Sequence, residues 1–229
     1  KIEHAIAAPN QGGEGTDGSW SCGPNTGYRT LRLLGEDGGS YYNFVKNCPR
    51  FTKEKLKGAV NDTAGSVANM LWLPGIMLAP FTCGLSLTPS LMLPQIAQVV
   101  GESITCDVGP RPTQLADYLA ASMQTNKAYY SGYIHQLGDD GYEKSIARDI
   151  YIGYPRIILL ISGTTNMHYV NIIGFKRNPS GLLTEAVILD TNGCIGVISA
   201  SELEKWLNRD GYADMILPAR YNTIETYKK

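Results

Sequence analysis

The chain has 229 residues, of which 43% are hydrophobic, so it is long and apolar enough to form one sizeable globular domain. Its formal net charge of −1 excludes the basic field that binding to nucleic acid or anionic lipid requires. Its five cysteines form no C-x-x-C pair and show no zinc-like spacing with the three histidines. We therefore expect no metal ion and no organic cofactor, while the redox compartment and the cellular location stay open.

One helix stands out in the first part of the chain. Residues 1–21 are predicted to form an extended arm and a glycine-rich loop, in which Gln11 is the notable polar side chain. The next helix is predicted from about residue 24 to residue 34, and Gly35 suits its C-terminus. Cys22 directly precedes this helix, where the helix dipole and unpaired N–H groups favour a thiolate over a thiol. The competing interpretation is a small buried cysteine without a chemical role.

From about residue 40 to residue 105 the pattern changes to short helices. A helix capped by Thr52 is predicted at 52–55, and two more at 63–73 and 91–100. The apolar run 71–81 is too short and too interrupted by prolines to span a membrane. It is interpreted as a buried helical hairpin, or as an exposed patch that contacts a protein partner or a membrane. Cys83, a second candidate thiol, has apolar neighbours that favour burial instead.

The second half of the chain switches from helices to strands. Helices are predicted at 113–123, with Thr113 as the cap, and at 142–152. Strands follow at 156–162, 168–175, 185–190 and 195–198, then a helix at 199–207 with a Ser199–Glu202 capping box, and a last strand near 215–217. Residues 178–181 form a hairpin loop between the second and third strands. Helices followed by antiparallel strands predict an α+β fold.

A nucleophilic cysteine needs a base, and His168 is the best-placed histidine. It begins a strand beside a turn, whereas His4 lies in the arm and His135 in a loop rich in tyrosine and glycine. Asp190 ends the strand that follows His168 through a hairpin, and in an antiparallel pair the start of one strand faces the end of its neighbour. Asp190 is therefore predicted to orient His168, with Asn192 as the alternative.

These residues, in this order, resemble the papain-like cysteine peptidases. Cys22-Gly23-Pro24 opens a helix, His168-Tyr169-Val170 leads into a strand, and Leu189-Asp190 ends the next strand; the closest resemblance is to the bacteriocin-processing peptidases of ABC exporters. It covers residues 9–35 and 110–217, including the helices at 113–123 and 201–207. The resemblance implies one papain-like domain over 1–229, in which an N-terminal helix carries the nucleophile and packs on a C-terminal antiparallel sheet. Residues 40–105 would be a helical insertion or cap.

The resemblance also implies a role for each site residue. Cys22 would be the nucleophile, His168 the general base and acid, and Asp190 the orienter of His168. Gln11 would donate to the oxyanion hole together with the backbone N–H of Cys22. The family glutamine usually lies about half as far before its cysteine, where this chain has Thr16. The glycine-rich segment 12–18 could bulge out and leave Gln11 in place.

The expected function is a thiol-dependent acyl transfer, most simply a cysteine peptidase or an amidase or isopeptidase, acting on a protein or peptide. Two alternatives stay open at this point. An amine could resolve the acyl-enzyme in place of water, as in a transglutaminase, or a glutamine side chain could be deamidated. In the other alternative, the chain is a binding module on a catalytically idle papain-like scaffold, and the apolar stretch 71–81 binds the partner.

Overall fold

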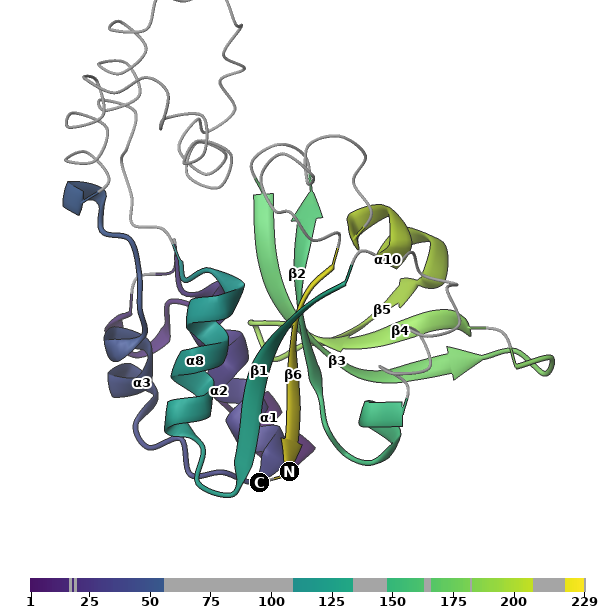
Figure 1. Cartoon of the computed structure of the whole chain (residues 1–229), viewed down its shortest axis with the longest axis horizontal. Coiled ribbons are helices and arrows are strands. Elements are labelled where there is room, and N and C mark those ends of the chain that lie inside the picture. The colour runs from purple at the N-terminus through teal and green to yellow at the C-terminus, as the bar shows by residue number, and fades with distance from the viewer. Residues whose placement is uncertain are drawn as a thin grey trace, which may run out of the picture.

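The computed structural model describes residues 1–16, 18, 20–55, 109–133, 148–162, 166–181, 183–207 and 221–228. The described part is an α+β structure, as predicted: helices pack beside a strongly twisted antiparallel sheet (Figure 1). The apolar stretch 71–81, Cys83, His135 and the strand predicted near 215–217 lie outside the described residues. Within the ranges above, no helix has the length and apolar character to cross a membrane.

The elements of the described chain follow one another in a simple order. They are α1 (Ile2–Ile6), the 3-10 helix η1 (Gly13–Gly15), α2 (Cys22–Leu34), α3 (Tyr41–Asn47), α8 (Pro112–Ser122), β1 (Asn126–Tyr133), β2 (Arg156–Ser162), β3 (Asn166–Arg177), β4 (Leu183–Leu189), β5 (Ile195–Ser199), α10 (Ala200–Leu207) and β6 (Tyr221–Lys228). Six described strands form one sheet in the order β1-β6-β2-β3-β4-β5, and each neighbouring pair is antiparallel.

The helix α2 is the centre of the packing, and ten of its thirteen residues are buried. It ends as predicted at Gly35, whose φ of 83° is the left-handed conformation that glycine adopts at no steric cost. Two hydroxyl groups fasten it to β3: Thr26 Oγ1 donates to the Tyr169 carbonyl at 2.9 Å, and Thr30 Oγ1 donates to Asn171 Oδ1 at 2.7 Å. The helix therefore has a fixed position on the strand that carries His168.

Side chains of β2 are buried on both faces of the sheet, which explains its uninterrupted apolar sequence. Ile157 and Leu159 join the core shared with α2, α3 and α8, whereas Ile158 and Leu160 join a second core that includes Leu203 of α10. The strands and hairpin predicted between 156 and 198 are confirmed, with small shifts at their ends. The predicted contact between Ser199 and Glu202 is also present, since the Ser199 hydroxyl accepts from the Glu202 N–H at 3.1 Å.

Two local predictions need correction, and three elements, α3, β1 and β6, were not predicted. The arm is not extended throughout, because α1 and η1 lie within residues 1–21. The helix α8 has Arg111 rather than Thr113 at its N-cap, with Pro112 in its first turn and the Gln114 side chain accepting from the Arg111 N–H at 3.0 Å. The helix α3 contributes Phe44 and Val45 to the main core, so residues 41–47 are an integral part of the packed domain.

Glu36 follows the C-terminus of α2 and anchors the start of β1. The sequence places it in a turn, yet its side chain is buried and accepts five hydrogen bonds. The donors are the N–H groups of Gln124, Thr125 and Asn126 and the side chains of Thr125 and Asn126, at 2.7 to 3.0 Å. Burial alone would raise the pKa of Glu36, but these hydrogen bonds outweigh it and lower the pKa from 4.5 to about 2.

We expect Glu36→Gln to destabilise the protein at neutral pH and to matter less in acid. A carboxylate whose pKa is lower in the folded state stabilises that state above its unfolded pKa, and the contribution disappears as the pH falls from about 4.5 towards 2. The shift from 4.5 to about 2 corresponds to at most about 3.5 kcal/mol. Urea unfolding at several pH values measures it, with the exposed Glu3→Gln as control. A difference between wild type and Glu36→Gln that stays constant with pH would contradict this account.

Candidate active site

Cys22 is the first residue of α2, and its side chain is partly buried against the main core. Gly23 allows this end of the helix to approach β3 closely. A Cβ atom at position 23 would lie 3.1 Å from the Tyr169 ring and 3.2 Å from Pro110, so a larger residue would require these side chains to shift by a few tenths of an ångström. Because His168 immediately precedes Tyr169 on β3, this close approach brings the thiol and the imidazole to the same place.

His168 and Asp190 are paired as predicted. His168 Nε2 lies 2.6 Å from Asp190 Oδ1, and each side chain is about one third exposed. The antiparallel register of β3 and β4 accounts for the pairing, since Asn171 lies opposite Leu189 and Asp190 therefore follows the end of β4 near the start of β3. The Cys22 side chain lies close enough to the same imidazole for its hydrogen bonding and charge to act on the pKa of His168. The structure thus brings all three predicted residues together.

The electrostatics of this cluster favour a protonated imidazole. Burial alone would lower the pKa of His168, but the hydrogen bond that it donates to Asp190 and the hydrogen bond and charge of Cys22 raise it to about 10. In turn, the hydrogen bond to His168 lowers the pKa of Asp190, against the effect of partial burial and with help from Thr191. The cluster can therefore hold a carboxylate, an imidazolium and a sulfur in a row.

Thr191 fixes the carboxylate that receives His168. Its backbone N–H donates to Asp190 Oδ1 at 2.6 Å. Its hydroxyl lies 3.0 Å from Gln11 Oε1 and 3.3 Å from Asp190 Oδ1; because a hydroxyl has one proton, the shorter contact to Gln11 is the better donor geometry. Asn192, the alternative orienter, is exposed and accepts instead from the Cys194 N–H at 2.8 Å. Asn192 therefore stabilises the turn after β4, and Asp190 contacts the histidine.

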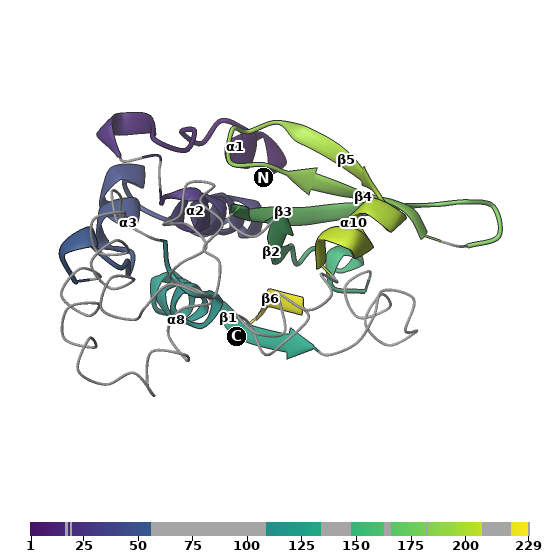
Figure 2. The same ribbon diagram turned by 90° about the horizontal axis from the view of Figure 1, so that it is seen from above.

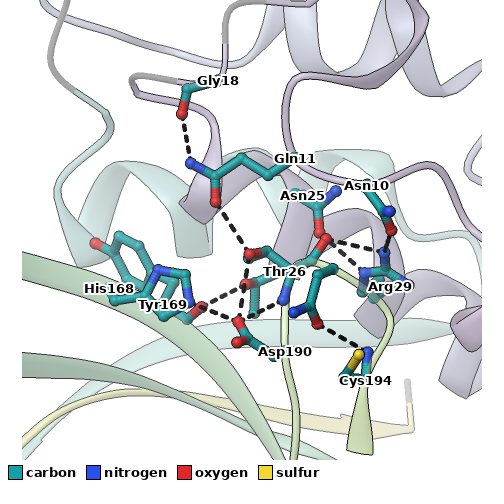
Figure 3. Close-up of polar contacts among 12 residues, drawn as sticks. Asn10, Gln11, Gly18, Asn25, Thr26, Arg29, His168, Tyr169, Asp190 and Cys194 are labelled. Carbon is teal, nitrogen blue, oxygen red and sulfur yellow. Dashed lines mark hydrogen bonds and ion pairs between the residues drawn. The ribbon is translucent and has the colours of Figure 1, made fainter.

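Gln11 lies beside the cluster although it is eleven residues before Cys22, because the chain folds back so that Gly18 approaches Gln11 (Figure 3). The Gln11 side-chain amide donates to the Gly18 carbonyl. Gly12 has a φ of 78°, and a Cβ atom there would be 3.2 Å from the Gly18 Cα, so the two ends of the bulge touch. The Thr16 hydroxyl donates to the Gly13 carbonyl at 2.8 Å inside the bulge. Gln11, rather than Thr16, therefore contacts the segment that carries Asp190.

The remaining candidates lie elsewhere or have ordinary surroundings. His4 is exposed on α1. Cys48 is a free, buried thiol, and Cys194 is a free, exposed thiol after the β4 turn. In the parts of the chain that the structure describes, no group of three or more histidine, cysteine, aspartate or glutamate residues is arranged to hold a metal ion.

Three residues beside the triad were not singled out from the sequence: Asn25, Arg29 and Thr191. Asn25 and Arg29 lie three and seven positions after Cys22, so they share its face of α2. Polar residues repeated on one face of a helix with a cysteine at its start were a usable signal. Thr191 carried none, since it makes its contacts largely through its backbone groups and with residues far away in the sequence.

A scan of the chain against protein-family models finds no match, and a search of curated proteins finds no significant relative. The function is therefore inferred from the geometry and chemistry of the site.

Proposed function

We propose that the chain is a thiol-dependent acyl-transfer enzyme, most simply a cysteine peptidase or an amidase or isopeptidase. The observation that carries the proposal is the row Cys22–His168–Asp190, with its 2.6 Å contact between imidazole and carboxylate. An imidazolium beside a sulfur at the start of a helix stabilises a thiolate, which is the nucleophilic form of cysteine. A carboxylate on the opposite side of the ring keeps the imidazole in one orientation and one tautomer.

In the proposed reaction the Cys22 sulfur forms a bond to the carbonyl carbon of an amide, and the electron pair of the carbonyl moves to oxygen. When the tetrahedral intermediate collapses, the C–N bond breaks and His168 gives its proton to the leaving amine. Water, losing a proton to His168, then attacks the thioester and releases the acid and the Cys22 thiolate. If an amine replaces water in this last step, the same intermediate leads to a transferase.

We assign the oxyanion hole to two hydrogen-bond donors, the Gln11 side-chain amide and the backbone N–H of Cys22. Gln11 is held on two sides, since its backbone N–H donates to the Thr191 carbonyl at 3.1 Å and its side-chain oxygen accepts from the Thr191 hydroxyl. One hydrogen of its NH₂ group goes to Gly18, which leaves the second available to a substrate oxygen. A fixed donor of this kind stabilises charge that develops in the transition state.

The order of these groups on the fold supports membership of the papain-like cysteine peptidases. The cysteine opens a helix packed on the sheet, the histidine lies near the start of a strand, and the aspartate follows the next strand. The substrate assigned by this proposal is a protein or peptide amide.

Alkylation by limiting iodoacetamide tests the nucleophile without a known substrate. At about pH 6 an ordinary thiol is almost wholly protonated, so we expect Cys22 to react about 100-fold faster than the exposed Cys194 of the same molecule. Peptide mapping by mass spectrometry identifies which cysteine is modified. His168→Ala should remove this advantage, because the stabilising cation is gone. Equal labelling of Cys22 in wild type and His168→Ala would contradict the proposal and favour an idle scaffold.

A further inference from the structure

Arg29 lies on α2 two turns after Cys22, and its side chain is wholly buried. Cys22, Asn25 and Arg29 occupy one face of the helix, at spacings of three and four residues. Asn25 and Arg29 are turned towards the N-terminal arm, and Arg29 also reaches the turn after β4 (Figure 3). The guanidinium therefore lies between two segments that each carry a residue of the proposed site.

All the acceptors of Arg29 in the described chain are neutral oxygens. They are the carbonyls of Ala5, Ile6, Ala8, Pro9 and Thr191 and the side-chain oxygens of Asn10 and Asn25. The other fully buried arginine, Arg156, is instead paired with Asp149 at 2.6 Å and Glu225 at 2.7 Å. A buried cation to which no carboxylate hydrogen-bonds is costly: burial lowers the pKa of Arg29, although the charge of Asp190 acts in the opposite direction. Arg29 therefore needs an explanation that Arg156 does not.

The packing around Arg29 shows what the cation holds together. Figure 2 places α1 beside the end of the sheet where β4 passes into β5. Gly193, in that turn, has a φ of 78°, and a Cβ atom there would lie 2.7 Å from the Ile6 carbonyl and 3.3 Å from Arg29 Nη1. The arm and the turn are thus packed closely enough that only glycine fits between them, and the guanidinium donates hydrogen bonds to both.

Hydrogen bonds of Thr191 connect Arg29 to the proposed triad. Arg29 Nη2 donates to the Thr191 carbonyl at 3.0 Å, and the Thr191 N–H donates to the oxygen of Asp190 that His168 contacts. The same Thr191 carbonyl accepts from the Gln11 N–H at 3.1 Å. The Thr191 carbonyl therefore accepts hydrogen bonds both from the Arg29 guanidinium and from Gln11, the arm residue assigned to the oxyanion hole.

We propose that Arg29 is a positioning residue of the active site: its guanidinium holds the Asp190–Thr191 turn and the arm that carries Gln11 in fixed register with the start of α2. This inference rests on the proposed function. It goes further by assigning the reactivity of Cys22 to a group two helical turns away that touches neither sulfur nor substrate. A lysine at position 29 would keep the charge but lose the planar fork that bonds several carbonyls at once.

The test compares Arg29→Lys with Arg156→Lys, a matched change of a buried arginine whose partners are remote from the triad. Circular dichroism and thermal unfolding follow the fold, and iodoacetamide at about pH 6 with peptide mapping follows Cys22. We expect Arg29→Lys to slow Cys22 alkylation at least about tenfold in the folded protein, as small misplacements of reactive groups do. Arg156→Lys should lower the melting temperature and leave Cys22 alkylation unchanged.

A second variant covers the case in which the lysine protein does not fold. Arg29→Ala leaves a space that free guanidinium at millimolar concentration can refill, and we expect it, but not an equal concentration of sodium chloride, to restore fast Cys22 alkylation. If folded Arg29→Lys labels Cys22 at the wild-type rate, or guanidinium restores the fold of Arg29→Ala without restoring the rate, Arg29 has only a structural role. These results leave the proposed function intact, because that proposal is tested by variants of Cys22, His168 and Asp190 and not by variants of Arg29.

Discussion

Replacing Cys22 by alanine is expected to reduce amide turnover by about 10⁵ to 10⁶-fold while leaving the fold in place. The reason is chemical, since no other described thiol faces His168 and no covalent intermediate can form without the sulfur. Cys22 is only partly buried, and removing one sulfur atom at the edge of the core leaves a small void. We therefore expect the melting temperature of Cys22→Ala to stay close to that of the wild type.

Turnover is measured first on mixed peptide substrates, with new amino termini detected by mass spectrometry. Cys194→Ala is the matched control, because Cys194 is an exposed free thiol outside the triad and its loss should leave turnover unchanged. Retention of wild-type turnover by Cys22→Ala would exclude Cys22 as the nucleophile. The wild-type protein could cleave no peptide and still be alkylated at Cys22 by iodoacetamide in a His168-dependent manner. That result would direct the search to isopeptide or side-chain amides.

The parts of the fold that could be predicted are those whose signal is local. The strand β2 contains a run of consecutive apolar residues, of which 157–160 are buried on both faces, and the hairpin between β3 and β4 follows from a loop of turn-forming residues. The helix α2 has an apolar face and a terminal glycine. Each of these signals lies within about fifteen consecutive residues, so neighbouring side chains indicate the structure without help from distant ones.

The strands β1 and β6 were missed because their partners are almost a hundred residues apart. They pair with each other from Asn126 opposite Lys228 to Tyr133 opposite Tyr221. In β6 only Ile224 is a buried aliphatic residue, and its neighbours Glu225 and Thr226 are buried through contacts with Arg156 and the Pro155 carbonyl. Buried polar residues with distant partners do not produce the alternating pattern by which a strand is predicted.

The candidate site divides in the same way. Cys22, His168 and Asp190 could be named from the sequence, because a helix start and the two ends of a hairpin fix their places. The contacts of Gln11 depend on how a bulge folds back on itself, and those of Arg29 on carbonyl groups that carry no sequence information. The position of a backbone acceptor follows only from the folded chain.

Asp190→Asn is expected to have the second-largest effect, a loss of about 10² to 10⁴-fold in turnover with the fold preserved. Asparagine has nearly the same shape and its oxygen can still accept from the Thr191 N–H, so the turn after β4 should be retained. What disappears is the negative charge beside the imidazole. Partial burial of His168 still opposes its protonation, and Cys22 is then the one group of the triad that favours it. The pKa of His168 should therefore fall from its value of about 10.

The direction of the pH effect follows from the sign of that shift. A raised pKa keeps the imidazolium present from acidic pH up to about 10 in the wild type, and a lower pKa in Asp190→Asn removes it at a lower pH. As the pH is raised, the part of Cys22 alkylation that depends on His168 should therefore disappear at a lower pH in Asp190→Asn than in the wild type. NMR titration of the three histidine rings, with His168→Ala used to assign the signal, measures the shift directly. If the His168 signal titrates at the same pH in wild type and Asp190→Asn, the carboxylate does not support the imidazolium, and the role assigned to Asp190 is wrong.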